Sequence, residues 1–78
     1  PEAPSWEDIR RTVLEHGRMI CAEKGEYTGM REMRAHMGFY IRGFRGSSRL
    51  RGATQQLSSY RELEELMNAF SPEETIKD

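Results

Sequence analysis

The chain has 78 residues and a mass of 9.1 kDa, which is enough for one small domain. This length excludes a complete (β/α)8 barrel, which needs roughly 200 residues or more, and it argues against a large buried active site. With 32% charged and 36% hydrophobic residues, the composition predicts a folded rather than a disordered chain.

The sequence shows no sign of a membrane segment or a metal site. No apolar run approaches the length of about 18 residues that a transmembrane helix needs, and no signal peptide is recognisable. The first residue is Pro1 rather than Met, which suggests a processed chain or a piece of a longer one. Cys21 is the single cysteine, so an internal disulfide is excluded, and with two histidines it cannot complete a zinc site. We therefore expect no membrane partner, no metal, and a reducing, cytoplasmic setting.

Charge is unevenly distributed along the chain, although the formal net charge is only −1. Residues 1–30 carry a net charge of −2, residues 31–51 of +5, and residues 52–78 of −4. Ten of the twelve basic residues are arginines, and arginine binds phosphate and base edges better than lysine does. The basic centre therefore indicates an anionic partner that the net charge alone would not indicate.

The first predicted helix spans 6–24. Ser5 is a good N-cap, Asp8 stands at the N3 position of a capping box, and Gly25 is typical of the residue after a helix end. Apolar residues recur with a period near 3.6 and define its buried face: Trp6, Ile9, Val13, Leu14, Ile20 and Cys21.

A second helix is predicted from Tyr27 or Thr28 to Arg42, with Gly43 after its end. Its predicted apolar stripe is Tyr27, Met30, Met33, Met37, Tyr40 and Ile41.

A tight connection at 44–47 is predicted to lead into a short third helix. Ser47 or Ser48 is expected to cap this helix, which runs to about Gln56.

The fourth predicted helix spans 60–70. Ser58 or Ser59 caps it, and Glu62 stands in capping-box spacing from Ser59. Its predicted buried face is Leu63, Leu66, Met67 and Phe70.

No segment alternates apolar and polar residues with a period of two, so the sequence predicts an all-α fold. We expect a small bundle of three to four helices that forms a single domain over residues 1–78. Pro72 is expected to stop the last helix and to leave a frayed tail at 71–78.

An arginine stripe is predicted on the second helix. At 100° per residue, four arginines and one glycine fall within a sector of about 80° beside the apolar stripe: Arg31, Arg34, Gly38, Arg42 and Arg45. Gly38 has no side chain, so the backbone of a partner could approach the helix there. Arg49 and Arg51 follow on the next helix, whose start at 46–48 offers free backbone N–H groups to an anion.

This arrangement favours a nucleic-acid partner. Guanidinium groups beside a helix N-terminus suit a phosphate backbone, and the interleaved Phe39, Tyr40 and Phe44 suit stacking on bases. The alternative is that the arginines form surface ion pairs, with the following acids as partners: Glu15, Glu23, Glu26 and those of the fourth helix.

The remaining reactive side chains do not form an active site. His36 lies on the flank opposite the arginine stripe and fits a hydrogen-bonded packing residue, or else a polar contact to RNA or to a neighbouring domain. Cys21 fits a buried, inert thiol, and the methionines at 19, 30, 33, 37 and 67 fit core filling better than a partner-binding groove. Without a catalytic constellation in the sequence, we expect no enzymatic activity in this chain.

A series of residues resembles a known family. They are Gly25-Glu26-Tyr27, Gly29, Arg31, Arg34-Ala35-His36, Phe39-Tyr40-Ile41-Arg42-Gly43-Phe44, Gly46-Ser47-Ser48, Leu50-Arg51, Ser59-Tyr60-Arg61-Glu62-Leu63 and Leu66. Over about residues 12–70 this pattern is similar to the C-terminal helical domain of bacterial flavin-dependent tRNA-dihydrouridine synthases. Its most specific part is an Arg-x-His-x-x-x-Tyr-x-Arg-Gly core followed by a Gly-Ser-Ser-x-Leu-Arg turn.

The resemblance implies a part of a modular enzyme. In that family an N-terminal (β/α)8 barrel holds FMN, NADPH supplies the reducing equivalents, and a cysteine of the barrel protonates the uracil ring. The helical domain grips the tRNA and helps to present the target uridine. Because the barrel is not in this chain, the resemblance implies no FMN or NADPH here, and Cys21 is not the catalytic cysteine.

Two positions depart from the family pattern. Ala35 stands where the family commonly has Lys or Arg before the motif histidine, and Arg45 stands where it often has Pro. The first change removes one phosphate contact and the second adds a charge, so we expect the basic patch to be shifted rather than lost.

The sequence therefore predicts the isolated tRNA-binding domain of a tRNA-dihydrouridine synthase, a monomer whose partners are tRNA and the FMN-binding barrel of the parent chain. The predicted tRNA-binding residues are Arg31, Arg34, His36, Tyr40, Arg42, Arg45, Arg49 and Arg51. Two other hypotheses stay open. One is a helical module that docks a protein partner through a Met-rich face. The other is a DNA-binding helix-turn-helix regulator, which lacks an evident base-contacting helix start and dimer interface.

Overall fold

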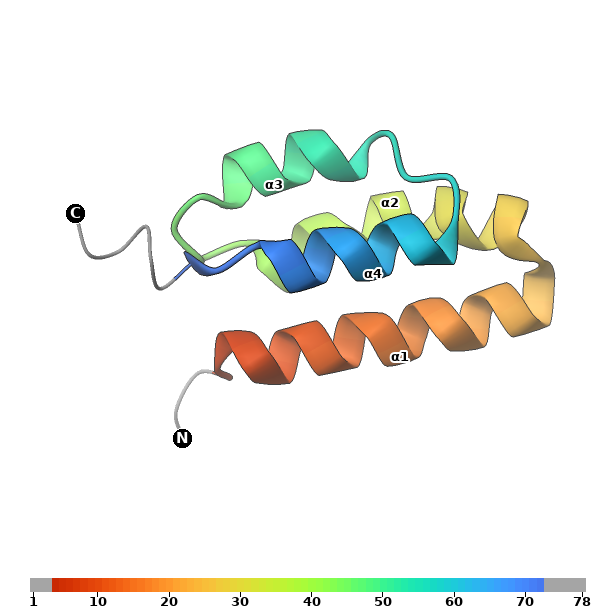
Figure 1. The fold of residues 1–78 in the computed structure, drawn as a ribbon, viewed down its shortest axis with the longest axis horizontal. Coiled ribbons are helices and arrows are strands. Elements are labelled where there is room, and N and C mark those ends of the chain that lie inside the picture. The colour runs from red at the N-terminus through yellow and green to blue at the C-terminus, as the bar shows by residue number, and fades with distance from the viewer. Residues whose placement is uncertain (1–3, 73–78) are drawn as a thin grey trace.

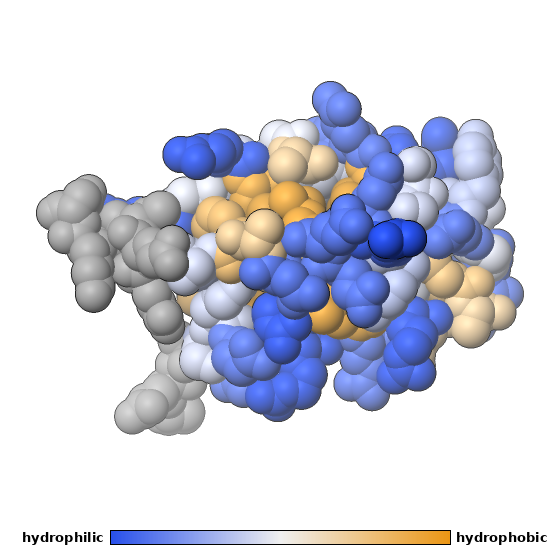
Figure 2. Space-filling model, viewed as in Figure 1, coloured by the Kyte–Doolittle hydropathy of each residue, from blue (hydrophilic) through white to orange (hydrophobic). Residues whose placement is uncertain are grey.

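The computed structural model describes residues 4–72 and folds them into four helices: α1 (Trp6–Lys24), α2 (Glu26–Ile41), α3 (Ser47–Thr54) and α4 (Tyr60–Ala69). Helix α1 packs against both α2 and α4, while α3 packs on α2 (Figure 1). The described part of the chain contains no strand, so the predicted all-α bundle is confirmed. Figure 2 shows hydrophilic residues over α1, and apolar residues gathered between α3 and α4 on the same face.

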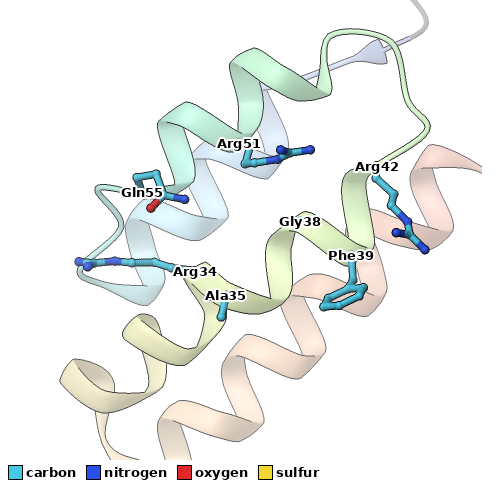
Figure 3. Close-up of a pocket in the computed structure, with 7 residues that line it drawn as sticks. All are labelled: Arg34, Ala35, Gly38, Phe39, Arg42, Arg51 and Gln55. Atoms are coloured by element: carbon cyan, nitrogen blue, oxygen red, sulfur yellow. The ribbon is translucent and has the colours of Figure 1, made fainter.

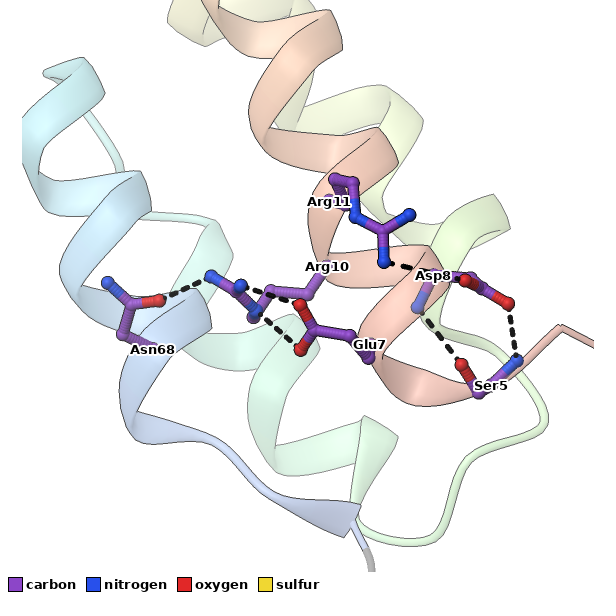
Figure 4. A network of polar contacts seen from close by, with 6 residues as sticks. All are labelled: Ser5, Glu7, Asp8, Arg10, Arg11 and Asn68. Atoms are coloured by element: carbon purple, nitrogen blue, oxygen red, sulfur yellow. Dashed lines mark hydrogen bonds and ion pairs between the residues drawn. The ribbon is translucent and has the colours of Figure 1, made fainter.

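The start of α1 is fixed by the predicted capping box. The Asp8 backbone N–H donates to Ser5 Oγ at 3.1 Å, and the Ser5 N–H donates to Asp8 Oδ2 at 3.3 Å (Figure 4). At the other end, Gly25 adopts φ 86°, a conformation that glycine accepts more readily than other residues. Gly25 also precedes the first residue of α2, so this helix begins at Glu26, slightly earlier than predicted.

The end of α2 and the start of α3 differ from the prediction. Helix α2 ends at Ile41 rather than at Arg42, because Arg42 has turned to an extended conformation with ψ 147°. Gly43 follows with φ 94°, as expected for a residue after a helix end. The N-cap of α3 is Gly46 in the left-handed conformation, and neither Ser47 nor Ser48 caps it.

The last two helices are each shorter than predicted. Helix α3 ends at Thr54, whose hydroxyl donates to the Arg51 carbonyl at 2.7 Å and competes with the next helical turn. Helix α4 ends at Ala69, since Phe70 is extended with ψ 137°. Pro72 is fully buried, so the chain stays packed at this residue, which lies in the predicted frayed tail. The rest of that tail, 73–78, lies outside the described residues.

The core is built on the methionine face of α2. Four residues of α2 are completely buried: Met30, Met33, Met37 and Ile41. They pack with buried residues of α1 and α4, which are Val13, Leu63 and Met67. The core role predicted for the methionines is therefore confirmed except at Met19, which is 60% exposed on α1. The same burial contradicts a Met-rich docking groove, because these thioethers cannot reach a partner.

Tyr27 was predicted on the buried stripe but is 76% exposed. It lies in the first turn of α2, where α1 has just ended and another residue makes the close contact between the helices. That residue is Gly29. A Cβ atom at this position would lie 3.1 Å from the Cys21 Cα and 3.2 Å from the Cys21 backbone nitrogen. Because Gly29 has no side chain, α2 can approach α1 closely at this position, while Tyr27 stays exposed to solvent.

An aromatic cluster closes the opposite end of the bundle. The Trp6 ring, 8% exposed, contacts Phe44 edge to face at 5.3 Å and Phe70 at 5.1 Å between ring centroids. Phe44 lies in the α2–α3 connection and Phe70 follows α4. One side chain of α1 thus holds two segments that are distant in the sequence.

We expect Gly29→Ala and Gly38→Ala to have opposite effects on stability. At Gly29 the added methyl meets the backbone of α1, so overpacking lowers the free energy of unfolding by about 1–3 kcal/mol. At Gly38 it meets nothing within 4 Å, so better helix propensity raises the free energy by about 0.5–1 kcal/mol. Urea titrations of both variants measure this difference, and equal effects would contradict the close approach of α1 and α2.

Glu62 makes the stability of α4 dependent on pH. The Ser58 N–H and hydroxyl donate to Glu62 Oε1 at 2.8 and 3.0 Å, and these hydrogen bonds lower the pKa of the Glu62 carboxyl. A lowered pKa in the folded state stabilises the fold above the ordinary glutamate pKa, and this stabilisation is lost as the pH falls through the lowered value. We expect the melting temperature of Glu62→Gln to fall less steeply than that of the unmodified chain as the pH is lowered into the acid range. Glu64→Gln, at an exposed position of the same helix without such hydrogen bonds to Ser58, is the control for the removal of one carboxylate.

Candidate nucleic-acid interface

A surface cleft of about 440 Å³ lies between α2 and α3. It is lined by Arg34, Ala35, Gly38, Phe39, Arg42, Arg51 and Gln55. Figure 3 shows Arg51 and Gln55 on the α3 side of the cleft, opposite the residues on the α2 side. The cleft therefore brings together three of the predicted tRNA-binding arginines from two helices.

Helical spacing explains why these side chains share one surface. Arg34 and Gly38 are four residues apart on α2, so they lie on one face of that helix, and Arg42, the residue directly after α2, lines the same cleft. Arg51 lies on α3, and Gln55 is the residue directly after that helix. Gly38 has no neighbouring atom within 4 Å of where a Cβ would stand. The predicted approach to bare backbone at Gly38 is thus sterically open.

Arg34 also has a structural role that the sequence did not indicate. Its Nε donates to the Leu57 carbonyl at 2.9 Å, in a half-buried position beside the loop between α3 and α4. A guanidinium has five N–H donors, and this bond uses one of them. Arg34 can therefore hold the α3–α4 loop and still present N–H groups to an anion.

The arginines of the cleft are not neutralised by acids of the described residues. Within 4–72, no ion pair joins an acidic side chain to Arg31, Arg34, Arg42, Arg49 or Arg51. Some of the acids that were weighed as partners have other roles. Glu26 Oε2, for example, accepts the Tyr60 backbone N–H at 2.7 Å. The surface ion-pair interpretation is therefore wrong for these five arginines.

Arginines on the other side of the molecule show the contrast. Arg10 donates to Glu7 at 2.8 Å and to Asn68 Oδ1 at 2.7 Å, which joins α1 to α4 (Figure 4). Arg61 pairs with Glu65 at 3.3 Å. Arg10 and Arg61 thus have acidic partners, whereas the arginines of the cleft have none among the described residues.

The other predicted binding residues lie outside this cleft. Arg31 lies over the Tyr27 ring at 5.4 Å, and Arg45 and Arg49 are exposed on the α2–α3 connection and on α3. Tyr40 is half-buried and forms a hydrogen bond of 2.9 Å with His16 Nδ1. His36 is exposed with its ring 4.9 Å from that of His16, so it is not the hydrogen-bonded packing residue that was expected.

Sequence reasoning missed Gln55 as part of the cleft. Its signal was the four-residue spacing from Arg51 within the predicted third helix, but a neutral side chain does not stand out in a search for basic residues. Ala35, which was noted only as a missing cation, lines the cleft as a small side chain beside Gly38.

No nucleophilic or metal-binding centre accompanies the cleft. Burial raises the pKa of the Cys21 thiol, and the nearby Glu26 carboxylate raises it further, so the thiol stays protonated at neutral pH. Cys21 is only half-buried, less than predicted. Among residues 4–72 there is no group of three or more potential metal ligands, and no helix there is long and apolar enough to cross a membrane.

We expect Arg34→Ala to destabilise the fold, unlike the other cleft variants. Loss of the charged hydrogen bond to the Leu57 carbonyl lowers the free energy of unfolding by about 1.5–3 kcal/mol. Arg42→Ala and Arg51→Ala remove exposed side chains and change it by about 0.5 kcal/mol or less. Thermal melts of the three variants test this, and equal melting temperatures would show that the Arg34 bond contributes nothing.

Comparison with known proteins confirms the resemblance. The chain is 35% identical over 68 residues to a protein named "Probable tRNA-dihydrouridine synthase" from Mycobacterium leprae strain TN. It is 32% identical, over 68 residues again, to proteins of the same name from two strains of Mycobacterium tuberculosis, CDC 1551 / Oshkosh and ATCC 25618 / H37Rv. No family model and no solved structure matches the chain. Each match covers 87% of this chain but 18% of the relative, so the chain is homologous to a short part of proteins named tRNA-dihydrouridine synthase.

Proposed function

We propose that this chain is the tRNA-binding helical domain of a tRNA-dihydrouridine synthase. The observation that carries the proposal is the cleft between α2 and α3, which is lined by three arginines that have no acidic partner among residues 4–72 and by an open stretch of backbone at Gly38. Relatives named for an enzyme that acts on tRNA supply the class of nucleic acid. Neither observation alone would select tRNA.

The mechanism is electrostatic docking of the phosphate backbone. Arg42 and Arg51 face phosphates from the two sides of the cleft, Arg34 adds its remaining N–H groups, and Gly38 lets the sugar-phosphate chain approach closely. Arg31 and Arg49 extend the positive surface along α2 and α3. Such contacts fix position rather than base sequence, so the domain recognises the shape of tRNA.

The chemical step belongs, in this proposal, to a part of the parent protein outside the matched region. That part reduces uridine to 5,6-dihydrouridine with FMN and NADPH in a barrel domain. The residues of the cleft do not fit a flavin, because a flavin ring needs an enclosed and mostly apolar pocket. This cleft is open and lined by guanidinium groups. We therefore assign binding and orientation of tRNA to this chain, and neither cofactor.

Tethering explains how a small domain can contribute to recognition. A domain of this size offers few phosphate contacts, so its own affinity for tRNA is expected to be weak. Joined to a catalytic domain that also contacts the tRNA, its binding becomes intramolecular, and a high effective concentration compensates for the weak affinity.

We expect a salt-dependent preference for tRNA in a binding titration of this chain. With an unmodified tRNA transcript, Arg42→Ala and Arg51→Ala each reduce the slope of log K against log salt by about one. The control is Arg61→Ala, which removes an equal charge from an arginine that already pairs with Glu65 on α4. A length-matched DNA duplex tests the preference for tRNA.

Two results would contradict the proposal. One is the absence of tRNA binding at low salt both for this chain and for the chain joined to a catalytic domain. The other is an equal loss in Arg61→Ala and Arg42→Ala, because binding would then depend on overall charge rather than on the cleft.

A further inference from the structure

Three aromatic residues accompany the arginines in the sequence, and the structure leaves one of them available. Tyr40 is half-buried and hydrogen-bonded to His16. Phe44 is half-buried and packs edge to face on Trp6. Phe39, by contrast, is 73% exposed at the rim of the cleft. The aromatic surface that remains for a ligand is therefore the Phe39 ring.

The surroundings of Phe39 suit a flat ligand attached to an anion. Arg42 places its guanidinium 5.7 Å from the centre of the Phe39 ring. Both residues also line a second hollow of about 320 Å³, whose apolar wall includes Ile9 and Phe44. Phe39 thus forms a ridge between a cationic cleft and an apolar hollow, and Figure 3 shows it beside Arg42 on α2.

We propose that Phe39 and Arg42 form a stacking site for an unpaired nucleobase. This inference rests on the proposed tRNA-binding function and goes beyond phosphate docking. Aromatic rings and guanidinium planes both stack on bases, and Arg51 lies across the cleft where the phosphate of the same nucleotide can be held. The bases of a regular duplex stack on each other and do not offer a free face. The ligand of this site is therefore a nucleotide in a loop, in a bulge, or flipped out of its stack.

The chain contains a matched control for this site. Tyr27 is 76% exposed on the same helix, and Arg31 lies 5.4 Å from the centre of its ring. This pair reproduces the chemistry of Phe39 and Arg42 but does not line the cleft. Because both rings are exposed, leucine substitutions at 27 and 39 should leave the fold intact, and thermal melts verify this.

The experiment compares RNA binding by this chain and its Phe39→Leu, Phe39→Tyr and Tyr27→Leu variants. The probes are a tRNA transcript, a hairpin with a single 2-aminopurine bulge, and the same hairpin fully paired. We expect Phe39→Leu to weaken binding of tRNA and of the bulged hairpin by roughly 5- to 100-fold, in line with the contribution of one stacked base. Phe39→Tyr and Tyr27→Leu should bind as the unmodified chain does.

Two further readouts separate stacking from charge. The salt dependence of binding should be unchanged in Phe39→Leu, because no cation is removed, whereas Arg42→Ala reduces it. The fluorescence of the 2-aminopurine bulge should fall when the unmodified chain binds and should stay high with Phe39→Leu.

Each outcome supports or overturns the inference. Arginine-dependent tRNA binding that Phe39→Leu leaves unchanged would overturn the stacking site alone and keep the proposed function. Equal loss in Phe39→Leu and Tyr27→Leu would also overturn it, since any exposed aromatic residue would then suffice. Failure of tRNA to bind to the cleft would overturn the proposed function and the stacking site together.

Discussion

The burial of the methionine face of α2 is the constraint on which the rest of the structure depends. Met30, Met33 and Met37 are fully buried, and this sets the rotation of α2 about its axis. A helix with one face so fixed has no freedom in the direction of its other side chains. The positions of Arg34 and Gly38 on the cleft side of α2 therefore follow from the packing of the core. Gly29, by admitting α1 closely, sets how deeply α2 lies in the bundle.

Local signals accounted for most of the fold. The capping box at Ser5, the glycine at 25 and the Ser59 cap of α4 are short-range features, and the structure shows all three. The errors came from contacts that the periodicity of apolar residues does not specify. Tyr27 fits the periodicity of the buried stripe, yet no helix covers it. Thr54 ends α3 early because it bonds back to Arg51, a choice that propensity alone does not predict.

The sequence predicted that the candidate site is rich in arginine, but not which of the arginines line the cleft. Helical geometry placed Arg34 and Arg42 together, while the inclusion of Arg51 and the exclusion of Arg31 depend on how α3 lies against α2. Likewise, the sequence could not show that Phe39 is the exposed one of the three aromatic residues. Phe44 packs on Trp6, and Tyr40 is hydrogen-bonded to His16. Sequence spacing describes one helix at a time, and a cleft between two helices requires their packing.

The bond between Arg34 and Leu57 has a consequence for how such a domain can diversify. Phe39, Arg42, Arg51 and Gln55 are exposed, so their replacement alters the ligand surface at little cost in unfolding free energy. Arg34 alone among the cleft arginines also holds a loop of the fold. Under the proposed function, selection for a different RNA can therefore act freely on the first group, whereas any change at Arg34 must also preserve a folded chain. At Arg34 alone among the cleft arginines, the proposed ligand contact and the stability of the fold depend on the same side chain.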